Sequence, residues 1–260
     1  MKKYFIYIIL FFILVLFLVI KIFLSSNLSN FVFSTVNGFE VKDDEIIGCS
    51  LKGGNIVIPK MIDGVLITRI GDNAFKGLEI ENVYIPDSIT SIGSYAFADN
   101  NITTLNIPSS VKEIGEGAFI HNEIMDLNIS KGTIIGDACF NDNKLDSSSA
   151  FFYRDNVLVS YGGSIKGNVV VPNIKSIGTK AFFESGIISV TIPNSVERIE
   201  DDAFKSNYLI EVYLSNNIDF VSETAFSNNI YLSEIVIDNN KDKLSNYPWG
   251  AYSSNLFWLK

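Results

Sequence analysis

One short phrase recurs along the chain at a nearly constant interval and constrains its fold more than any other feature. Residues 91–108 show it in full, SIGSYAFADNNITTLNIP, with a first half Ile-Gly-x-x-Ala-Phe, a short polar loop and a second half Ile-x-x-Leu-x-Ile-Pro. The alanine position recurs at residues 74, 96, 118, 139, 181, 203 and 225, and residue 139 is a cysteine. The step from residue 139 to residue 181 is twice as long as the others, so it equals two repeats. A regular period of roughly 20–50 residues predicts a solenoid of stacked coils.

Each position of the phrase has a physical role in such a stack. Leu105 and Ile107 are two positions apart, so they share one face of a strand and point into the core, and the following proline ends the strand. The glycine of Ile92-Gly93 predicts a tight bend or a positive φ. A polar residue follows each phenylalanine by three positions and is expected to bond the backbone of neighbouring turns. These corner positions are Asn100, Asn122, Asn143, Asn207 and Asn229, with Ser185 in one coil and Leu78 in the first.

The pattern Leu-x-x-Leu-x-Leu followed by an Asn corner is typical of leucine-rich repeats. The variant found here, with Ile-Pro closing the strand and Ser-Ile-Gly-x-x-Ala-Phe opening the next coil, resembles the BspA-like leucine-rich repeats of bacterial surface proteins over roughly residues 39–258. The resemblance implies a mostly-β leucine-rich-repeat solenoid of the α/β type. One parallel sheet is expected, with the Ile-Gly-x-x-Ala-Phe arm opposite it as a short helical or irregular segment. It also implies adhesin-like binding at a cell surface and no enzymatic activity.

The N-terminal segment, residues 1–24, has the composition of a membrane segment. Residues 4–20 carry no charge, and residues 22–24 extend the apolar run past Lys21. A helix of this length spans about 31 Å, close to the hydrocarbon thickness of a bilayer. We therefore predict a transmembrane signal anchor over residues 1–24, in contact with the membrane through residues 4–24; a cleaved signal peptide is the alternative. Lys2 and Lys3 would keep the N-terminus cytoplasmic and place the repeats outside, either on the cell membrane or secreted after cleavage.

Residues 25–38 are expected to form a stalk, and residues 39–238 one continuous solenoid. Residues 39–59 and 151–172 share an aromatic start, a polar turn, a Gly-Gly pair and a closing Ile-Pro or Val-Pro. The polar turn predicts a β-hairpin, which would cap the stack at the first position and mark an irregular seam over residues 144–165 at the second. Residues 239–260 are expected to be the C-terminal cap, with Trp249 and Trp258 covering Ile235 and Ile237.

The charge excludes one class of partner. After residue 24 the chain holds 17 Lys and Arg against 29 Asp and Glu, a net charge of −12. Nucleic acid needs clustered basic residues, so it is not expected as a partner. Cys49 and Cys139 have neither metal-ligand nor redox spacing and are expected to be free and buried, while His121 is expected to be a solvated loop residue. No catalytic, cofactor-binding or metal site is predicted.

The outward side chains of the strands are the remaining candidates for binding. They mix acids, tyrosines and small polar groups, which suits a protein or glycan ligand. The predicted contact residues are Glu81, Tyr84, Asn106, Asp126, Asn128, Thr191, Glu211, Tyr213 and Glu234. The predicted function is adhesin-like binding of a host or neighbouring-cell protein at the bacterial cell surface. The alternative is a structural or scaffolding role within the cell envelope.

Overall fold

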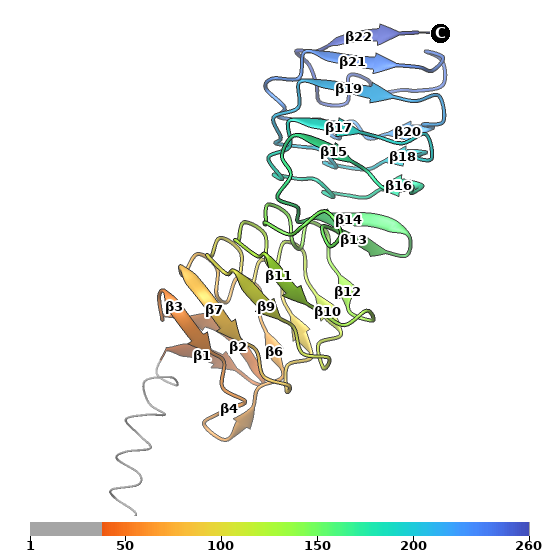
Figure 1. Ribbon diagram of the computed structural model, residues 1–260. Helices are drawn as coiled ribbons and strands as arrows, with labels where there is room; N and C mark the ends of the chain where they lie inside the picture. Colours follow the sequence, from red (N-terminus) through yellow and green to blue (C-terminus); the bar gives the residue numbers. More distant parts are fainter. Residues whose placement is uncertain (1–37, 260) are drawn as a thin grey trace, which may run out of the picture. The chain divides into compact units, whose positions relative to one another are not determined.

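The computed structural model describes residues 38–259, which form a stack of coils built from short strands (Figure 1). No helix occurs among these residues, so none of them forms a membrane-crossing helix. The predicted anchor (residues 1–24) and all of the predicted stalk except Gly38 lie outside the described residues.

The second half of each repeat forms one set of parallel strands. Their bounds are β3 (Gly54–Val57), β7 (Ile80–Tyr84), β9 (Thr104–Asn106) and β11 (Asp126–Asn128), then β15 (Asn168–Val170) and β17 (Ser189–Thr191), then β19 (Glu211–Leu214), β21 (Glu234–Ile237) and β22 (Asn255–Trp258). We call the outward surface of these nine strands the strand face. Apart from one shift between β3 and β7, the register is regular; for example, Leu105 pairs with Leu127. Inward residues such as Leu105 and Ile107 are buried, as the alternation predicts.

A second set of strands is mostly two residues long. It was not predicted, except for the strands beside the polar turns Asp43-Asp44 and Asp155-Asn156, where hairpins were expected. It comprises β1 (Phe39–Lys42), β2 (Glu45–Cys49), β6 (Arg69–Ile70), β8 (Ser91–Ile92), β10 (Glu113–Ile114) and β12 (Ile134–Ile135), then β13 (Phe151–Arg154), β14 (Val157–Tyr161), β16 (Ser176–Ile177), β18 (Arg198–Ile199) and β20 (Phe220–Val221). We call these the narrow sheets. A separate small hairpin pairs β4 (Met61–Ile62) with β5 (Val65–Leu66). The expectation of one sheet per coil was therefore wrong.

Of the helical or irregular arms that were expected, the structure shows irregular ones, because left-handed residues flank most of the phenylalanines. Positive φ angles occur two residues before the phenylalanine in six coils and two residues after it in most coils. The residues before are Asn73, Tyr95, Gly117, Ala138, Lys180 and Asp202; those after are Gly77, Asp99, His121, Asp142, Glu184, Ser206 and Asn228. A right-handed helix needs negative φ, so the arm closes as two tight turns instead.

A column of stacked rings fills the core. The rings of Phe75, Phe97 and Phe119 lie 4.9 and 5.1 Å apart between centroids, with planes within 5° of parallel, and all three are fully buried. The column continues through the long step of the repeat, where the ring of Tyr161 lies 5.2 Å from that of Phe182. Tyr161 therefore supplies the ring next to Phe182 in the stretch where the sequence pattern lacks an Ala-Phe pair.

The asparagine corners bond as predicted. The side chain of Asn122 is buried; its Oδ1 accepts from the amide of Ile102 at 3.1 Å, and its Nδ2 donates to the carbonyls of Phe97 and Phe119 at 2.9 and 3.2 Å. Asn100, Asn143 and Asn207 make equivalent bonds. These four corners therefore satisfy backbone groups that the strands cannot reach. Asn229 only donates, to the carbonyls of Phe204 and Phe226, and the prediction fails for Ser185, whose buried hydroxyl has no partner in the described part of the chain.

The glycine of the arm has a different role from the one predicted. Gly93 and Gly115 do not have a positive φ. A Cβ atom at Gly93 would lie 2.6 Å from the backbone nitrogen of Asp72, and one at Gly115 would lie 2.5 Å from that of Ser94. Glycine is required because the neighbouring coil passes so close, and not because of a bend.

At residues 144–165 the coil pattern is replaced by an antiparallel hairpin, β13–β14, and by an isolated bridge between Leu145 and Gly163. Asn141 organises this stretch, because its side chain is fully buried and bonds in both directions along the stack. Its Oδ1 accepts from the Ser160 hydroxyl and the Tyr161 amide at 2.8 and 2.9 Å. Its Nδ2 donates to the carbonyls of Lys180 and Phe183 at 2.9 and 2.8 Å, so it connects the coils on both sides of the hairpin.

At the C-terminal end, β22 adds one more strand to the stack. Leu256 pairs with Ile235 and Trp258 pairs with Ile237, and both isoleucines are fully buried. Trp249 is also fully buried. At the other end, the turn Asp43-Asp44 joins β1 to β2.

Candidate binding surfaces

The nine predicted contact residues all lie on strands of the strand face. All are exposed except Glu234, which is half-buried. Glu81 is outward because the register shifts where β3 meets β7, so both Glu81 and Asn82 face solvent. Alternation along the strands therefore turns the other eight residues outward, and the register shift does so for Glu81.

The structure divides these residues into groups, because β11 and β15 belong to different sheets. In the first group, the outward asparagines bond one another across strands. The amide of Asn128 donates to Asn106 at 2.6 Å, and that of Asn82 donates to Asn55 at 2.8 Å. The exposed ring of Tyr84 lies in register with Val57 on the neighbouring strand. The asparagine amides already form hydrogen bonds with one another. Tyr84 is therefore the side chain of this group that is best placed to contact a ligand.

Between the first and last groups, Thr191 donates its hydroxyl to Asn168 at 3.0 Å. Val170, in register with Thr191, is 62% exposed.

The last group has an acidic row beside an apolar row. Glu211 pairs in register with Glu234, and neither forms an ion pair with any residue in the 38–259 range. Two positions along the same strands, Tyr213 pairs with Val236, which in turn pairs with Phe257. Like charges placed side by side on a sheet destabilise it, so folding does not explain the choice of two glutamates there.

Three outward apolar residues were not predicted as contacts: Val57, Val170 and Phe257. They are 54%, 62% and 47% exposed. Val57 and Val170 lie on strands that the sequence predicted, but a valine in a strand is normally assigned to the core. Phe257 lies in the segment that was predicted to be the C-terminal cap. The alternation with Ile56 and Val169 is the signal that could have identified the two valines.

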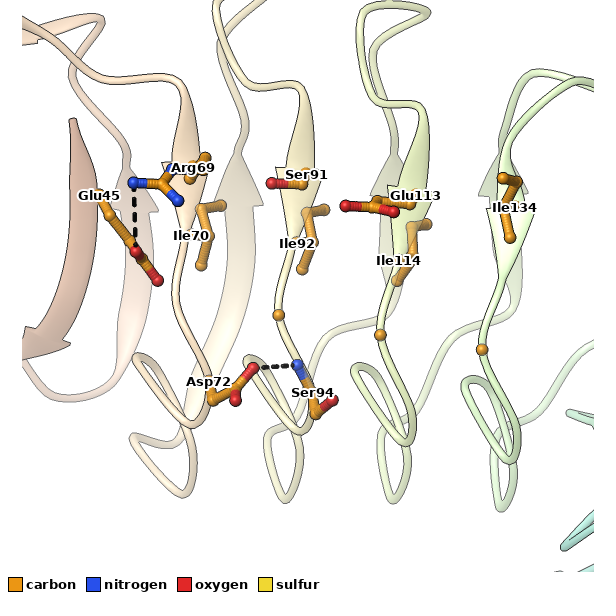
Figure 2. Close-up of a pocket in the computed structure, with 13 residues that line it drawn as sticks. Glu45, Arg69, Ile70, Asp72, Ser91, Ile92, Ser94, Glu113, Ile114 and Ile134 are labelled. Carbon is orange, nitrogen blue, oxygen red and sulfur yellow. Dashed lines mark hydrogen bonds and ion pairs between the residues drawn. The ribbon is translucent and has the colours of Figure 1, made fainter.

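A groove of about 340 Å³ runs across the narrow sheet formed by β2, β6, β8, β10 and β12 (Figure 2). Its outward residues include Arg69, Ser91, Glu113 and the exposed Ile134. Figure 2 shows the Asp72 carboxylate accepting from the Ser94 amide, at 2.7 Å. The sequence did not predict this groove, because an arm was expected where the narrow sheet lies.

Much of the polar surface at one end of this groove is already paired. Arg69 lies 2.7 Å from the Asp44 carboxylate and 3.5 Å from that of Glu45. Hydrogen bonds from Thr68 and Arg69 lower the pKa of Asp44. These groups therefore hold adjacent coils together, and the groove offers a ligand few free polar atoms.

The two cysteines differ in burial, which shifts the pKa of both thiols in the same direction. Burial raises the pKa of the Cys139 thiol, which is fully buried, and also that of Cys49, which is half-buried rather than buried as expected. Both cysteines are free. Over residues 38–259, no cluster of three or more His, Cys, Asp or Glu is arranged to hold a metal ion.

Stacked coils, an asparagine corner and a parallel strand face define a leucine-rich-repeat solenoid. The chain belongs to the family of BspA type leucine rich repeat regions, whose model matches six copies over residues 39–152 and 161–255. Repeats of this family are typically binding scaffolds without enzymatic activity.

One solved structure agrees on the fold, and a second is similar in sequence. A leucine-rich repeat protein from Eubacterium ventriosum has a TM-score of 0.52 and 17% identity, over 79% of this chain and 72% of that one. A leucine rich cell surface protein from Faecalibacterium prausnitzii is 24% identical with a TM-score of 0.43, over 78% of this chain and 53% of that one. The chain therefore spans about half the length of that second protein. No curated protein matches the chain.

Proposed function

We propose that this chain is a non-enzymatic binding protein that holds a protein partner on its strand face. One observation carries the proposal: three large aromatic side chains point outward from the strands and are not part of the core. Tyr84, Tyr213 and Phe257 are 62%, 44% and 47% exposed. Tyrosine and other aromatic residues commonly anchor protein interfaces, because they bury a large area with few rotatable bonds.

The charge of the face indicates the kind of partner. Glu81, Asp126, Glu211 and Glu234 leave the face acidic, and most of its other outward residues are uncharged. A partner with basic residues would relieve the repulsion between Glu211 and Glu234.

We also propose that the repeats lie outside the cell. This proposal is supported by the sequence of residues 4–24, which is almost entirely apolar and is preceded by Lys2 and Lys3. Fusion of alkaline phosphatase after residue 260 tests it, because that enzyme is active only outside the cytoplasm. Activity in the fusion supports the extracytoplasmic location, and an inactive but intact fusion contradicts it.

The binding proposal is tested with immobilised protein against extracellular-matrix proteins, whole cells and the envelope proteins of the producing cell. The strand-face variant combines Tyr84→Ser, Tyr213→Ser and Phe257→Ser. The matched control combines Tyr153→Ser and Tyr252→Ser, two exposed tyrosines outside the strand face.

The proposal is supported if the wild-type chain binds a probe saturably, the strand-face variant loses this binding and the control keeps it. Capture of an envelope protein of the producing cell would instead favour the scaffolding role. Absence of saturable binding to every probe by a folded chain contradicts a binding function on this face.

A further inference from the structure

A row of left-handed residues runs along one corner of the stack, away from the strand face. Each follows its phenylalanine by two positions and has φ between 50 and 59°. They are Asp99, His121, Asp142, Glu184, Ser206 and Asn228. Left-handed turns superpose in successive regular coils, so these polar side chains are repeated about every 4.8 Å from Asp99 to Asp142 and again from Glu184 to Asn228. The β13–β14 hairpin separates the two runs in the sequence.

Several of these side chains contact one another. The ring of His121 lies 2.9 Å from the Asp99 carboxylate through Nδ1 and 3.3 Å from that of Glu184 through Nε2. Lys166 lies 2.8 Å from the Asp142 carboxylate, and Asn228 donates to the Ser206 hydroxyl at 3.0 Å. These contacts fix the positions of the polar groups, so the row is preorganised.

Two adjoining grooves of about 430 and 310 Å³ lie over this row. They share Glu184, Ser206 and Tyr208; Asp142 belongs to the first groove and Asn228 to the second. We call the pair the corner groove. It spans several coils and is open to solvent along its length.

Aromatic and aliphatic side chains stand beside these polar groups. Tyr208 and Tyr231 are 54% and 59% exposed, and their rings lie 6.1 Å apart at an angle of 44°. Ile230, which lines the second groove, is 71% exposed. Neither tyrosine hydroxyl has a hydrogen-bond partner in the described part of the chain. The core does not use these rings, and their faces are available to a ligand.

This combination fits a sugar chain. An aromatic face packs against the C–H face of a pyranose, while carboxylate, amide and hydroxyl groups bond the ring hydroxyls. Glu184, Ser206 and Asn228 come from successive coils, and the coil spacing is close to the length of one sugar ring, so successive rings of a sugar chain would meet successive coils. The groove contains two carboxylates, Asp142 and Glu184, against one lysine, which disfavours an anionic chain.

We propose that the corner groove binds an uncharged glycan, at a site separate from the strand face. Tyr208, which lines both grooves, and Tyr231, whose ring lies beside that of Tyr208, provide the stacking surface. Glu184, Ser206 and Asn228 bond the hydroxyl groups.

The test measures binding of the full chain to purified oligomers of glucose, mannose and N-acetylglucosamine, and to sulfated and uronic-acid oligomers. The variants are Tyr208→Ala and Tyr231→Ala, and the matched control combines Tyr84→Ala and Tyr213→Ala on the strand face. Loss of one stacking ring should weaken binding about tenfold. Tyr208→Phe keeps the ring and should keep binding within about threefold.

Saturable binding of at least one neutral oligomer, weakened by the groove variants and unchanged in the control, supports the proposal. Stronger binding of the anionic oligomers, or no neutral oligomer bound by folded protein, overturns it. If the groove variants lose a protein partner while no glycan binds, the groove is a protein site and the proposal fails. The strand-face variants are separate, so this result does not depend on the outcome for the proposed function.

Discussion

At the scale of single residues, close packing between coils imposes the strictest requirement. At Gly115, an added Cβ would lie 2.5, 2.7 and 2.9 Å from three backbone atoms of Ser94 and Gly93. Backbone atoms cannot rotate away as a side chain can, so the neighbouring coil would have to move.

Gly115→Ala should therefore destabilise the fold by about 1–3 kcal/mol, the usual cost of overpacking. Urea unfolding followed by circular dichroism measures the change. Gly132→Ala is the control, because a Cβ there meets nothing within 4 Å and the φ of Gly132 is not positive. Equal losses in both variants would mean that close coil contact is not the reason for the glycine.

The asparagine corner provides a second test at this scale. Asn122→Ala removes the acceptor for the Ile102 amide and the donor to two carbonyls, all in a buried site. An unsatisfied buried polar group costs about 1–3 kcal/mol, so we expect Asn122→Ala to lower the free energy of unfolding by at least that much. Urea unfolding measures the change. The exposed neighbour Asn101→Ala should change stability by less than about 0.5 kcal/mol. A neutral Asn122→Ala would contradict the assigned role.

At the scale of elements, the hairpin β13–β14 interrupts the coils, and a few side chains connect the two sides. The Nζ atom of Lys180 lies 2.5 Å from the carboxylate of Glu116, which also accepts from the hydroxyl of Tyr95 at 2.6 Å. Burial alone would raise the pKa of Glu116, but hydrogen bonds from Lys180 and Tyr95 outweigh it, so the pKa of Glu116 is lowered.

A lowered carboxyl pKa gives a definite pH dependence. The stability that Glu116 contributes is fully present above its ordinary pKa of 4.5 and is lost as the pH falls through the lower folded-state value. Glu116→Gln should therefore make the stability less dependent on pH below 4.5 than in the wild type. Unfolding curves between neutral pH and acid measure this difference. An unchanged acid dependence would contradict the coupling across the hairpin.

Several parts of the fold were predictable from the sequence, for a physical reason. Phe97, Asn122 and Leu105 have roles that only one residue class can fill, so their spacing survives in nearly every coil. The narrow sheets were missed because a two-residue strand such as Ser91–Ile92 is too short to show alternation. The left-handed turns were missed because Tyr95, Ala138 and Lys180 rarely adopt that conformation.

The candidate sites were predictable to different extents. Alternation along the strands was enough to place Tyr84 and Tyr213 outward. The corner groove was not predictable, because the position of Tyr208 is held by Asn101, Glu123 and Lys144 in other coils. Only the stacking of coils shows that such a position lies over a row of polar groups.

At the scale of the whole molecule, a stack of coils should open as a cooperative unit around its core. Cys139 is fully buried within the column of coils, whereas Cys49 is half-buried near the first coil. We expect an alkylating reagent to modify Cys49 in the folded protein and Cys139 only when the stack opens. In a urea series, labelling of Cys139 should follow the global unfolding transition. Labelling of Cys139 well below that transition would indicate that the stack opens locally.

The central claim is that the inward residues of each repeat stabilise the fold, whereas the outward residues of the strand face bind the partner. Surface plasmon resonance with the partner found in the binding panel tests it most directly, with wild-type protein and the variant carrying Tyr84→Ser, Tyr213→Ser and Phe257→Ser. We predict that the variant keeps its free energy of unfolding within about 1 kcal/mol and loses binding at least tenfold. Unchanged binding by the folded variant would contradict the claim.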